Sequence, residues 1–271
     1  MPELPEVQTV VDSLRLNLNG KSILSVDFLW GKTSGNLPCA VMAQKLGGKT
    51  IREVTRRAKY ILIHLDEGTL IVHLRMEGRF FVLPMQDQIR KHSHVLLYLS
   101  DGLRVEYNDT RKFGRFYYYD ADQPHSILDK LGPEPFNPEL TAKILHQATR
   151  KKRTMLKVWL LDQTHIAGIG NIYADEICFA AKMSPRQPVG RITRKQWEEI
   201  LNQTRTILNK AILAGGTTIR SYTSSLGITG RFQITLNAYG RSGLPCHVCG
   251  TPCNASSLDN AAPSIAPSVR K

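Results

Sequence analysis

The chain changes its hydrophobic pattern at residues 132–135, Gly-Pro-Glu-Pro, and this change most limits the folds open to it. Before it, short apolar runs rich in β-branched and aromatic residues alternate with turn signals such as Asp101-Gly102, a pattern typical of strands. Leu4–Leu18 instead has helical apolar spacing. The predicted strands are Ile23–Leu29, Tyr60–Leu65, Thr69–Leu74, Val95–Leu99, Leu103–Tyr107 and Arg115–Tyr119. The first part is therefore predicted to be a β-sandwich with an N-terminal helix.

The second part of the chain has helical periodicity. The predicted helices are Pro138–Thr149, Thr154–Asp162, Asn171–Ala181 and Arg194–Ala214. Gly-Ile-Gly at residues 168–170 separates two of them, and Gly215-Gly216 ends the last. Beyond Tyr239 the chain is rich in Cys, Gly, Pro and Ser. We predict an α+β protein with domains at residues 1–132, 133–236 and 237–271.

The charge balance indicates a polyanionic partner. Lys and Arg number 36 against 23 Asp and Glu, a net charge of +13, and each neutralised phosphate of a nucleic acid releases counterions. A basic surface that only aids solubility is the alternative, which charge by itself leaves open. No apolar run is long enough to span a bilayer, and the first residues lack the pattern of a signal peptide. The odd number of cysteines, 5, argues against a disulfide framework.

The N-terminus contains the residues best suited to covalent chemistry. Removal of Met1 would expose Pro2, whose secondary amine can attack a sugar C1′ and form an iminium ion. An α-amino group titrates at roughly 7.7–8.0, so part of it is unprotonated near neutral pH. Glu3 would lie beside the amine as a general acid, and Glu6 could orient the pair. Alternatively, these residues simply start a helix, where Pro and acidic residues are favoured.

Several sequence blocks, in order along the chain, resemble the formamidopyrimidine-DNA glycosylases. The first block is the opening Met-Pro-Glu-Leu-Pro-Glu-Val. Its Leu4 favours this purine-directed branch, because the related endonuclease VIII branch usually has Gly at the same position. The other blocks are Arg56–Tyr60, His73–Gly78, Asp109–Gly114, Ala167–Glu176, Tyr239–Arg241 and Cys246–Gly250. This resemblance implies a C-terminal helix–two-turn–helix domain followed by a zinc ribbon.

The resemblance also implies site residues. Pro2 corresponds to the nucleophile, Glu3 to the proton donor and Lys59 to the lysine that assists the sugar eliminations. The residues that fill the gap left by a flipped-out nucleotide correspond to Met76, Arg111 and Phe113. The matching DNA contacts are His92, Arg111 and Lys152, with Lys157 and Asn171 as a phosphate clamp. Taken without the resemblance, Met76 and Phe113 would be read as core residues and Lys59 as a solvated lysine.

Backbone flexibility marks two further DNA-facing segments. Gly168 and Gly170 allow backbone N–H groups to approach a phosphate at the start of a helix. Gly215–Phe232 corresponds to the loop that closes over the flipped base. Glu77 is a candidate contact to the damaged base.

The predicted function is that of a bifunctional DNA glycosylase and apurinic/apyrimidinic lyase in base excision repair. Its implied partner is double-stranded DNA containing 8-oxoguanine or formamidopyrimidines, bound by a monomer in the bacterial cytoplasm, at the nucleoid. An alternative is a non-catalytic or impaired binder of damaged DNA. A plain basic DNA-binding protein with an incidental Pro2 would explain neither the ordered blocks nor the pairing of Pro2 with Glu3.

The C-terminal tail departs from the family pattern. The resemblance implies a zinc ion per chain, held by two Cys-x-x-Cys pairs, but only Cys246 and Cys249 form such a pair here. A closed structural site needs four ligands, which His247 and Cys253 do not restore in the ribbon geometry. Zinc binding is therefore in question, and the Ala-, Ser- and Pro-rich Asn254–Lys271 is typical of a disordered end.

A reading-frame slip near Pro252 or Cys253 is one hypothesis for this tail. The third base of each codon is then read with the first two bases of the next codon. Over the stretch from Cys253 to Pro263, this shifted reading permits a sequence that ends in Arg-Gly-Thr. It then permits Cys-Pro-Gln-Cys over Ile265–Val269, at the ribbon separation of roughly 15–20 residues. The shifted reading restores the missing cysteine pair and the arginine that grips a phosphate in the family. Codons incompatible with this reading would exclude the hypothesis.

Overall fold

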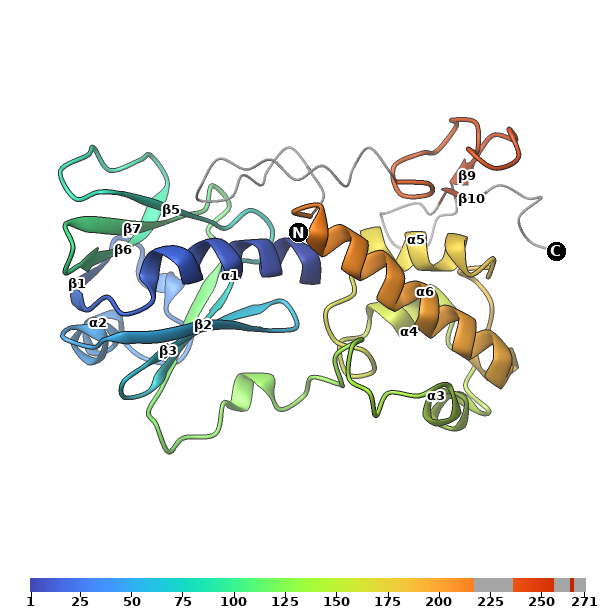
Figure 1. Ribbon diagram of the computed structural model, residues 1–271, viewed down its shortest axis with the longest axis horizontal. Coiled ribbons are helices and arrows are strands. Elements are labelled where there is room, and N and C mark those ends of the chain that lie inside the picture. The colour runs from blue at the N-terminus through green and yellow to red at the C-terminus, as the bar shows by residue number, and fades with distance from the viewer. Residues whose placement is uncertain (217–235, 256–263, 266–271) are drawn as a thin grey trace. The chain divides into compact units, whose positions relative to one another are not determined.

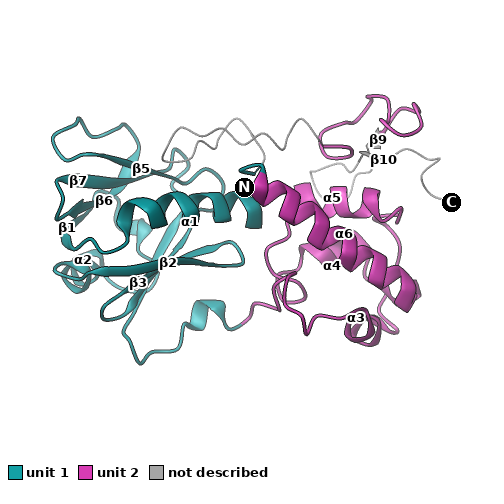
Figure 2. Cartoon of the chain, viewed as in Figure 1, with its two compact units in different colours: residues 1–129, 214–231 teal, residues 130–213, 232–271 magenta. Residues whose placement is uncertain are grey.

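The computed structural model describes residues 1–216, 236–255 and 264–265 (Figure 1). The described chain forms two compact units (Figure 2). The first contains residues 1–129 and 214–216, and the second contains residues 130–213 and the described residues from 236 onward. Antiparallel sheets in the first and helices in the second confirm the predicted α+β class.

The first unit contains two four-stranded antiparallel sheets, in the orders β1-β6-β7-β5 and β2-β3-β4-β8. The strands are β1 Ile23–Phe28, β2 Ile51–Arg57, β3 Tyr60–Leu65, β4 Thr69–His73, β5 Arg79–Pro84, β6 Ser93–Leu99, β7 Leu103–Asn108 and β8 Arg115–Tyr119. Short 3-10 helices lie at Gly31–Thr33 and Ser126–Leu128. Apolar side chains from both sheets share one core, which makes the unit a β-sandwich.

Helix α1, Leu4–Leu18, completes this core. Val7, Val10 and Leu14 follow the 3.6-residue period and are all buried in the cluster formed by the two sheets. Helix α2, Cys39–Leu46, adds Met42 and Leu46 to the same cluster. The N-terminal residues are thus fixed on a rigid scaffold.

The sequence prediction missed β2, β5 and α2. In β2 the register shifts between Ile51 and Glu53, and a bulge of this kind breaks the period-two alternation that marks a strand. Only Ile51 and Val54 of this strand are fully buried, three residues apart. Helix α2 has 8 residues, which is too short for a periodic signal.

The second unit contains four α-helices among the described residues: α3 Ala142–Thr149, α4 Leu156–Leu161, α5 Asn171–Ala180 and α6 Arg194–Leu213. A 3-10 turn lies at Val189–Arg191. The predicted start of the first helix at Pro138 is wrong, because Thr141 caps it by accepting a hydrogen bond from the Ile144 N–H (3.4 Å). Trp197 of α6 is buried and donates from Nε1 to Thr149 Oγ1 (3.1 Å), which joins α6 to α3.

The end of the described chain contains two short strands, β9 Asn254–Ala255 and β10 Ser264–Ile265, paired antiparallel. The prediction of a disordered tail from Asn254 is wrong for these residues. Among the residues described, no helix combines the length and the apolarity needed to cross a membrane.

Candidate active site

Pro2 and Glu3, just before α1, and Glu6, in its first turn, are all buried. Glu3 is the N-cap, and its N–H donates to Glu6 Oε2 (3.0 Å) in a capping box. Glu3 and Glu6 are each only 3% exposed, whereas Met1 is 41% exposed. The capping box therefore fixes the carboxylate of Glu3 next to Pro2, while the residue before Pro2 remains accessible for removal.

The β2–β3 hairpin brings Lys59 to these carboxylates. Arg57 pairs with Tyr60, which leaves Ala58 and Lys59 as the turn, and Ala58 has a left-handed φ of 53°. Lys59 is 5% exposed. Burial lowers the pKa of its amine, and the charges of Glu3 and Glu6 oppose this shift. Lys59 and Glu3, far apart in the sequence, thus interact in one buried site.

Gly216 lies against the same helix start. Its φ is +79°, and a side chain there would bring a Cβ to 3.0 Å from Glu6 Oε1. The chain after α6 thus returns to the candidate site at a position that only glycine fits well. The rest of the predicted loop Gly215–Phe232 lies outside the described residues.

His73 is a neighbour of Lys59 that the sequence analysis did not select as a site residue. It pairs with Tyr60 across β3 and β4, and the two rings meet edge to face at 4.6 Å. Its Nδ1 accepts the Arg75 N–H (3.0 Å). Burial, followed by the charges of Arg75 and Lys59, lowers the pKa of His73 to about 3. The imidazole is therefore neutral at physiological pH.

Replacing His73 by Asn is expected to reduce the amount by which the free energy of unfolding of the first unit falls as the pH is lowered. The pKa of His73 falls from 6.5 to about 3 on folding, so the unfolded chain takes up the proton first as pH falls. The native state should lose at most about 1.4 kcal/mol per pH unit below roughly 6.5 for this group. Hydrogen exchange of β3 and β4 amides at pH 7 and pH 5 measures this loss. An equal loss in wild type and in His73→Asn would contradict it.

Two loops at one end of the sandwich carry the predicted gap-filling residues. Met76 is 37% exposed and Phe113 is 46% exposed. The guanidinium of Arg111 lies 4.9 Å from the centroid of the Phe113 ring. Large apolar side chains exposed in this way are available for contact with a partner rather than needed for the core.

Asp109 holds the loop that contains Arg111 and Phe113. It is fully buried, and its carboxylate accepts N–H bonds from Arg111 (3.0 Å), Phe113 (2.9 Å) and Gly114 (2.8 Å). The Tyr107 hydroxyl donates to it as well (3.2 Å). The sequence signal for this role is the Asp-Thr-Arg-Lys-Phe-Gly block itself, because a single Asp followed by a tight turn often binds the turn's backbone.

His92 and Glu77 belong to the same end of the unit. The carbonyl of His92, at a left-handed φ of 70°, accepts the Asp109 N–H (3.0 Å). Glu77 Oε2 accepts the Thr110 hydroxyl. Among the predicted residues, the structure thus brings His92 and Glu77 together with the loop of Arg111 and Phe113.

In the second unit, Asn171 is exposed at the first position of α5. The turn before it depends on Gln163, whose amide donates to the Ile169 carbonyl (2.8 Å) and accepts the Gly168 N–H (2.9 Å). Gly168 has a φ of +104°. This φ favours glycine at residue 168, but the Gly168 N–H already donates to Gln163, so the approach of backbone N–H groups to a phosphate at this turn stays a prediction.

Lys152 and Lys157 differ sharply in exposure. Lys152 is exposed, on a turn that hydrogen-bonds to Gly190 (3.0 Å). Lys157 is 1% exposed, and its Nζ lies 2.9 Å from Asp175 Oδ1. Burial raises the pKa of Asp175 to about 6 despite this partner. Lys152 is available to a phosphate, whereas a phosphate contact by Lys157 remains a prediction that requires its ammonium to reach solvent.

Cys246 and Cys253 of the tail are buried close together, whereas Cys249 is exposed. Cys246 Sγ accepts the Val248 N–H (3.4 Å), and the Cys253 N–H donates to the Leu244 carbonyl (2.8 Å), which brings Cys253 back towards Cys246. Within the described part of the chain, no three His, Cys, Asp or Glu side chains are arranged to hold a metal. The described residues therefore do not fit the four-ligand site that a structural zinc needs.

Each of the two units matches a domain of known DNA-repair enzymes. A family model described as the formamidopyrimidine-DNA glycosylase N-terminal domain matches residues 1–116, and the H2TH domain of the same enzymes matches residues 131–223. The two units are thus those of a DNA glycosylase. The chain belongs to the formamidopyrimidine-DNA glycosylase family, as its motifs predicted.

Individual relatives cover nearly the whole chain. The Enterococcus faecalis enzyme is 39% identical over 254 residues, 93% of this chain and 91% of the relative. The Exiguobacterium sp. enzyme is 41% identical over 253 residues, 92% of each chain. Wild-type Lactococcus lactis Fpg in complex with N7-benzyl-Fapy-dG containing DNA has a TM-score of 0.92 at 32% identity, covering 100% of both chains. The Lactococcus lactis complex with an abasic site containing DNA has a TM-score of 0.91 at 31% identity, covering 99% of both.

Proposed function

We propose that this protein removes oxidised purines from double-stranded DNA and then cuts the strand at the resulting abasic site. The observation that carries the proposal is the shared burial of Pro2, Glu3 and Lys59, which combines an amine, a carboxylic acid and an ammonium at one place on a rigid scaffold. Amine nucleophiles paired with a nearby acid are typical of covalent catalysis through an iminium ion.

The proposed reaction begins after loss of Met1. The Pro2 amine attacks C1′ of the flipped nucleotide, and the bond to the base breaks with its electron pair on the base, which takes up the proton that the amine loses. The bond between C1′ and the ring oxygen then opens to give the iminium, as Glu3 donates a proton to that oxygen. The resulting iminium makes the C2′ proton acidic, and its removal expels the 3′ phosphate by β-elimination. Lys59 assists the eliminations from its buried position next to Glu3.

The proposed substrate follows from the relatives. Solved Lactococcus lactis relatives are complexes with DNA that contains Fapy-dG or an abasic site. For this chain we propose 8-oxoguanine and formamidopyrimidines in duplex DNA, bound by a monomer in the bacterial cytoplasm. Met76, Arg111 and Phe113 would fill the space of the extruded nucleotide, and His92, Lys152 and Asn171 would contact phosphates. Glu77 and Lys157 are proposed as further base and phosphate contacts.

An assay with two duplexes separates this function from its main alternative. One duplex carries 8-oxoguanine opposite cytosine and the other carries an abasic site. Release of free 8-oxoguanine, measured by mass spectrometry, together with strand cleavage on a denaturing gel is the expected result. Tight binding to the abasic duplex without either product would instead indicate a non-catalytic binder.

The altered tail is expected to weaken DNA binding and the second elimination. The matched comparison is a variant in which residues 253–271 are replaced by the shifted reading with its second Cys-x-x-Cys. The replaced chain should bind about one zinc ion, because it supplies four thiolates, and should bind the abasic duplex more tightly than the present chain. Full zinc occupancy and equal affinity in the present chain would contradict this expectation.

A further inference from the structure

The outer face of the β1-β6-β7-β5 sheet contains a buried ion pair that the proposed reaction does not use. Val105 and Tyr107 of β7 point into the sandwich core, so strand alternation places Arg104 and Glu106 on the opposite face. That face of an antiparallel sheet is commonly in contact with water. Arg104 is nevertheless 2% exposed and Glu106 is fully buried.

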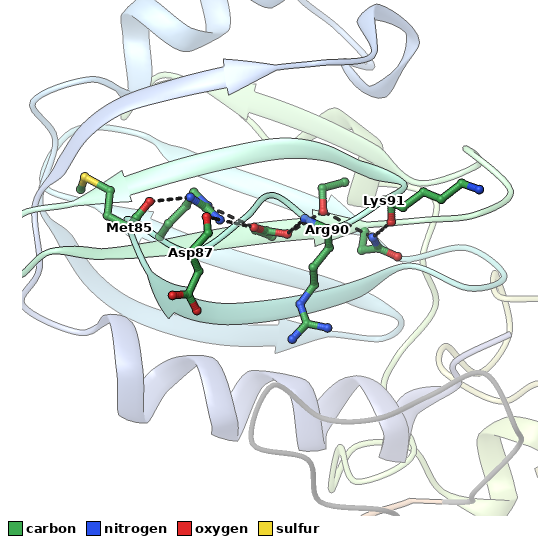
Figure 3. Close-up of polar contacts among 8 residues, drawn as sticks. Met85, Asp87, Arg90 and Lys91 are labelled. Carbon is green, nitrogen blue, oxygen red and sulfur yellow. Dashed lines mark hydrogen bonds and ion pairs between the residues drawn. The ribbon is translucent and has the colours of Figure 1, made fainter.

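The segment 85–92, which joins β5 to β6, provides the partners of Arg104 (Figure 3). Arg104 Nη1 donates to the Met85 carbonyl (2.6 Å), and Nη2 donates to the Asp87 carbonyl (2.9 Å). Its Nε donates to Glu106 Oε1 (3.1 Å). The guanidinium therefore fixes two backbone carbonyls of the segment at once, which a rigid planar donor does well.

Glu106 fixes the second half of the same segment. Its Oε2 accepts the Arg90 N–H (3.2 Å) and the Ser93 hydroxyl (2.7 Å). Asn108, next on the same face of β7, donates from Nδ2 to the Lys91 carbonyl (2.7 Å). The hydrogen bonds in Figure 3 thus join one strand to both halves of the segment.

The segment ends at His92, where it joins the loop of the gap-filling residues. The Asp109 N–H donates to the His92 carbonyl (3.0 Å). The Asp109 carboxylate in turn holds the N–H groups of Arg111 and Phe113. Arg90, Lys91 and His92 are all exposed, so the end of the segment nearest that loop carries three exposed basic residues. The guanidinium of Arg90 lies 4.3 Å from the centroid of the Phe81 ring.

A buried ion pair is an inefficient way to stabilise a fold, because removing two charges from water costs more than their attraction often returns. Such a pair does demand particular partners, since any other segment conformation would leave a buried charge unsatisfied. We propose that Arg104 and Glu106 are positioning residues that hold segment 85–92 so that Arg90, Lys91 and His92 meet DNA phosphates. This inference rests on the proposed function of lesion-DNA binding.

The test replaces both charges, Arg104→Met with Glu106→Leu, which leaves the net charge unchanged. We expect an apparent thermal midpoint no lower than that of wild type, faster hydrogen exchange at the Arg90 amide, and unchanged kcat at saturating DNA. The Kd for the abasic duplex should rise about tenfold, and the slope of log K against log salt should fall by about one for each DNA phosphate that the variant no longer neutralises. If the pair were only structural, the salt slope would stay the same, and the Kd would not rise while kcat stays unchanged.

The matched control is Lys21→Met with Asp101→Leu, which removes a more exposed ion pair elsewhere in the same unit. This control should keep the Kd, the salt slope and the Arg90 exchange rate. If Arg104→Met with Glu106→Leu does not fold, Arg104→Lys, which keeps the charge but loses the planar fork, should show the same changes more weakly. Unchanged Arg90 exchange and salt slope in the folded variants would overturn the inference. If wild type binds no lesion DNA, the proposed function fails instead, and the Arg90 exchange still decides whether the pair holds the segment.

Discussion

A protein that carries one extra glycine before Pro2, in place of Met1, is expected to lose base release and strand cleavage by about 10³-fold or more. The extra peptide bond turns the Pro2 nitrogen into a tertiary amide, which has no lone pair available to form an iminium. Pro2 and Glu3 are buried, whereas the residue before Pro2 is exposed, so the added glycine should block the Pro2 nitrogen without displacing Glu3. Single-turnover cleavage of the 8-oxoguanine duplex measures the loss.

The control for this experiment is the same fusion protein cleaved so that Pro2 is the first residue. Both forms should bind the abasic duplex within a few-fold of each other, because the glycine adds no charge. Cleavage by the blocked form at the rate of the control would show that another amine is the nucleophile. Lys59 would then be the first candidate, since it lies in the same site.

Substituting Glu3 by Gln is expected to slow base release by about 10²–10⁴-fold, the range for loss of a general acid. Gln has the shape of Glu and retains an oxygen that can cap α1, but it has no proton to donate to the sugar ring. Strand cleavage at a preformed abasic site should fall much less, because the base has already left. The ratio of the two rates, measured on the two duplexes, is the diagnostic quantity.

Glu6→Gln is the matched variant for Glu3→Gln. It removes the same charge from the neighbourhood of Lys59 and keeps an oxygen for the Glu3 N–H. We expect less than a tenfold change in base release for this variant. Equal losses in the two variants would mean that the site needs the total negative charge rather than a proton from Glu3.

The elements that position the catalytic candidates could largely be predicted from sequence. Helix α1 was predicted with its observed ends because its apolar spacing is regular and its first turn contains Pro5 and Glu6. Strands β3, β4 and β8 were predicted because each is rich in aromatic or β-branched residues. The meeting of Lys59 with Glu3 was implied only by family resemblance, since no local pattern reports that contact.

The features that could not be predicted are charged side chains buried by segments far away in the sequence. Arg104 and Glu106 lie on a strand whose alternation of apolar and polar residues predicts one exposed face. Their burial comes from segment 85–92, which has no periodic pattern. Likewise, the family resemblance gives Lys157 as a phosphate contact, whereas the fold buries it against Asp175. Charged residues in such positions reveal their partners only once the tertiary structure is known.

Borohydride trapping of the covalent intermediate tests directly whether Pro2 is the nucleophile. The protein, with Met1 removed, is mixed with the 8-oxoguanine duplex or the abasic duplex, reduced, and digested, and the cross-linked peptide is sequenced by mass spectrometry. We expect a stable adduct on both duplexes, mapped to the Pro2 nitrogen. An adduct at Lys59, or no adduct on either duplex although Met1 has been removed, would contradict the role of Pro2 as the nucleophile.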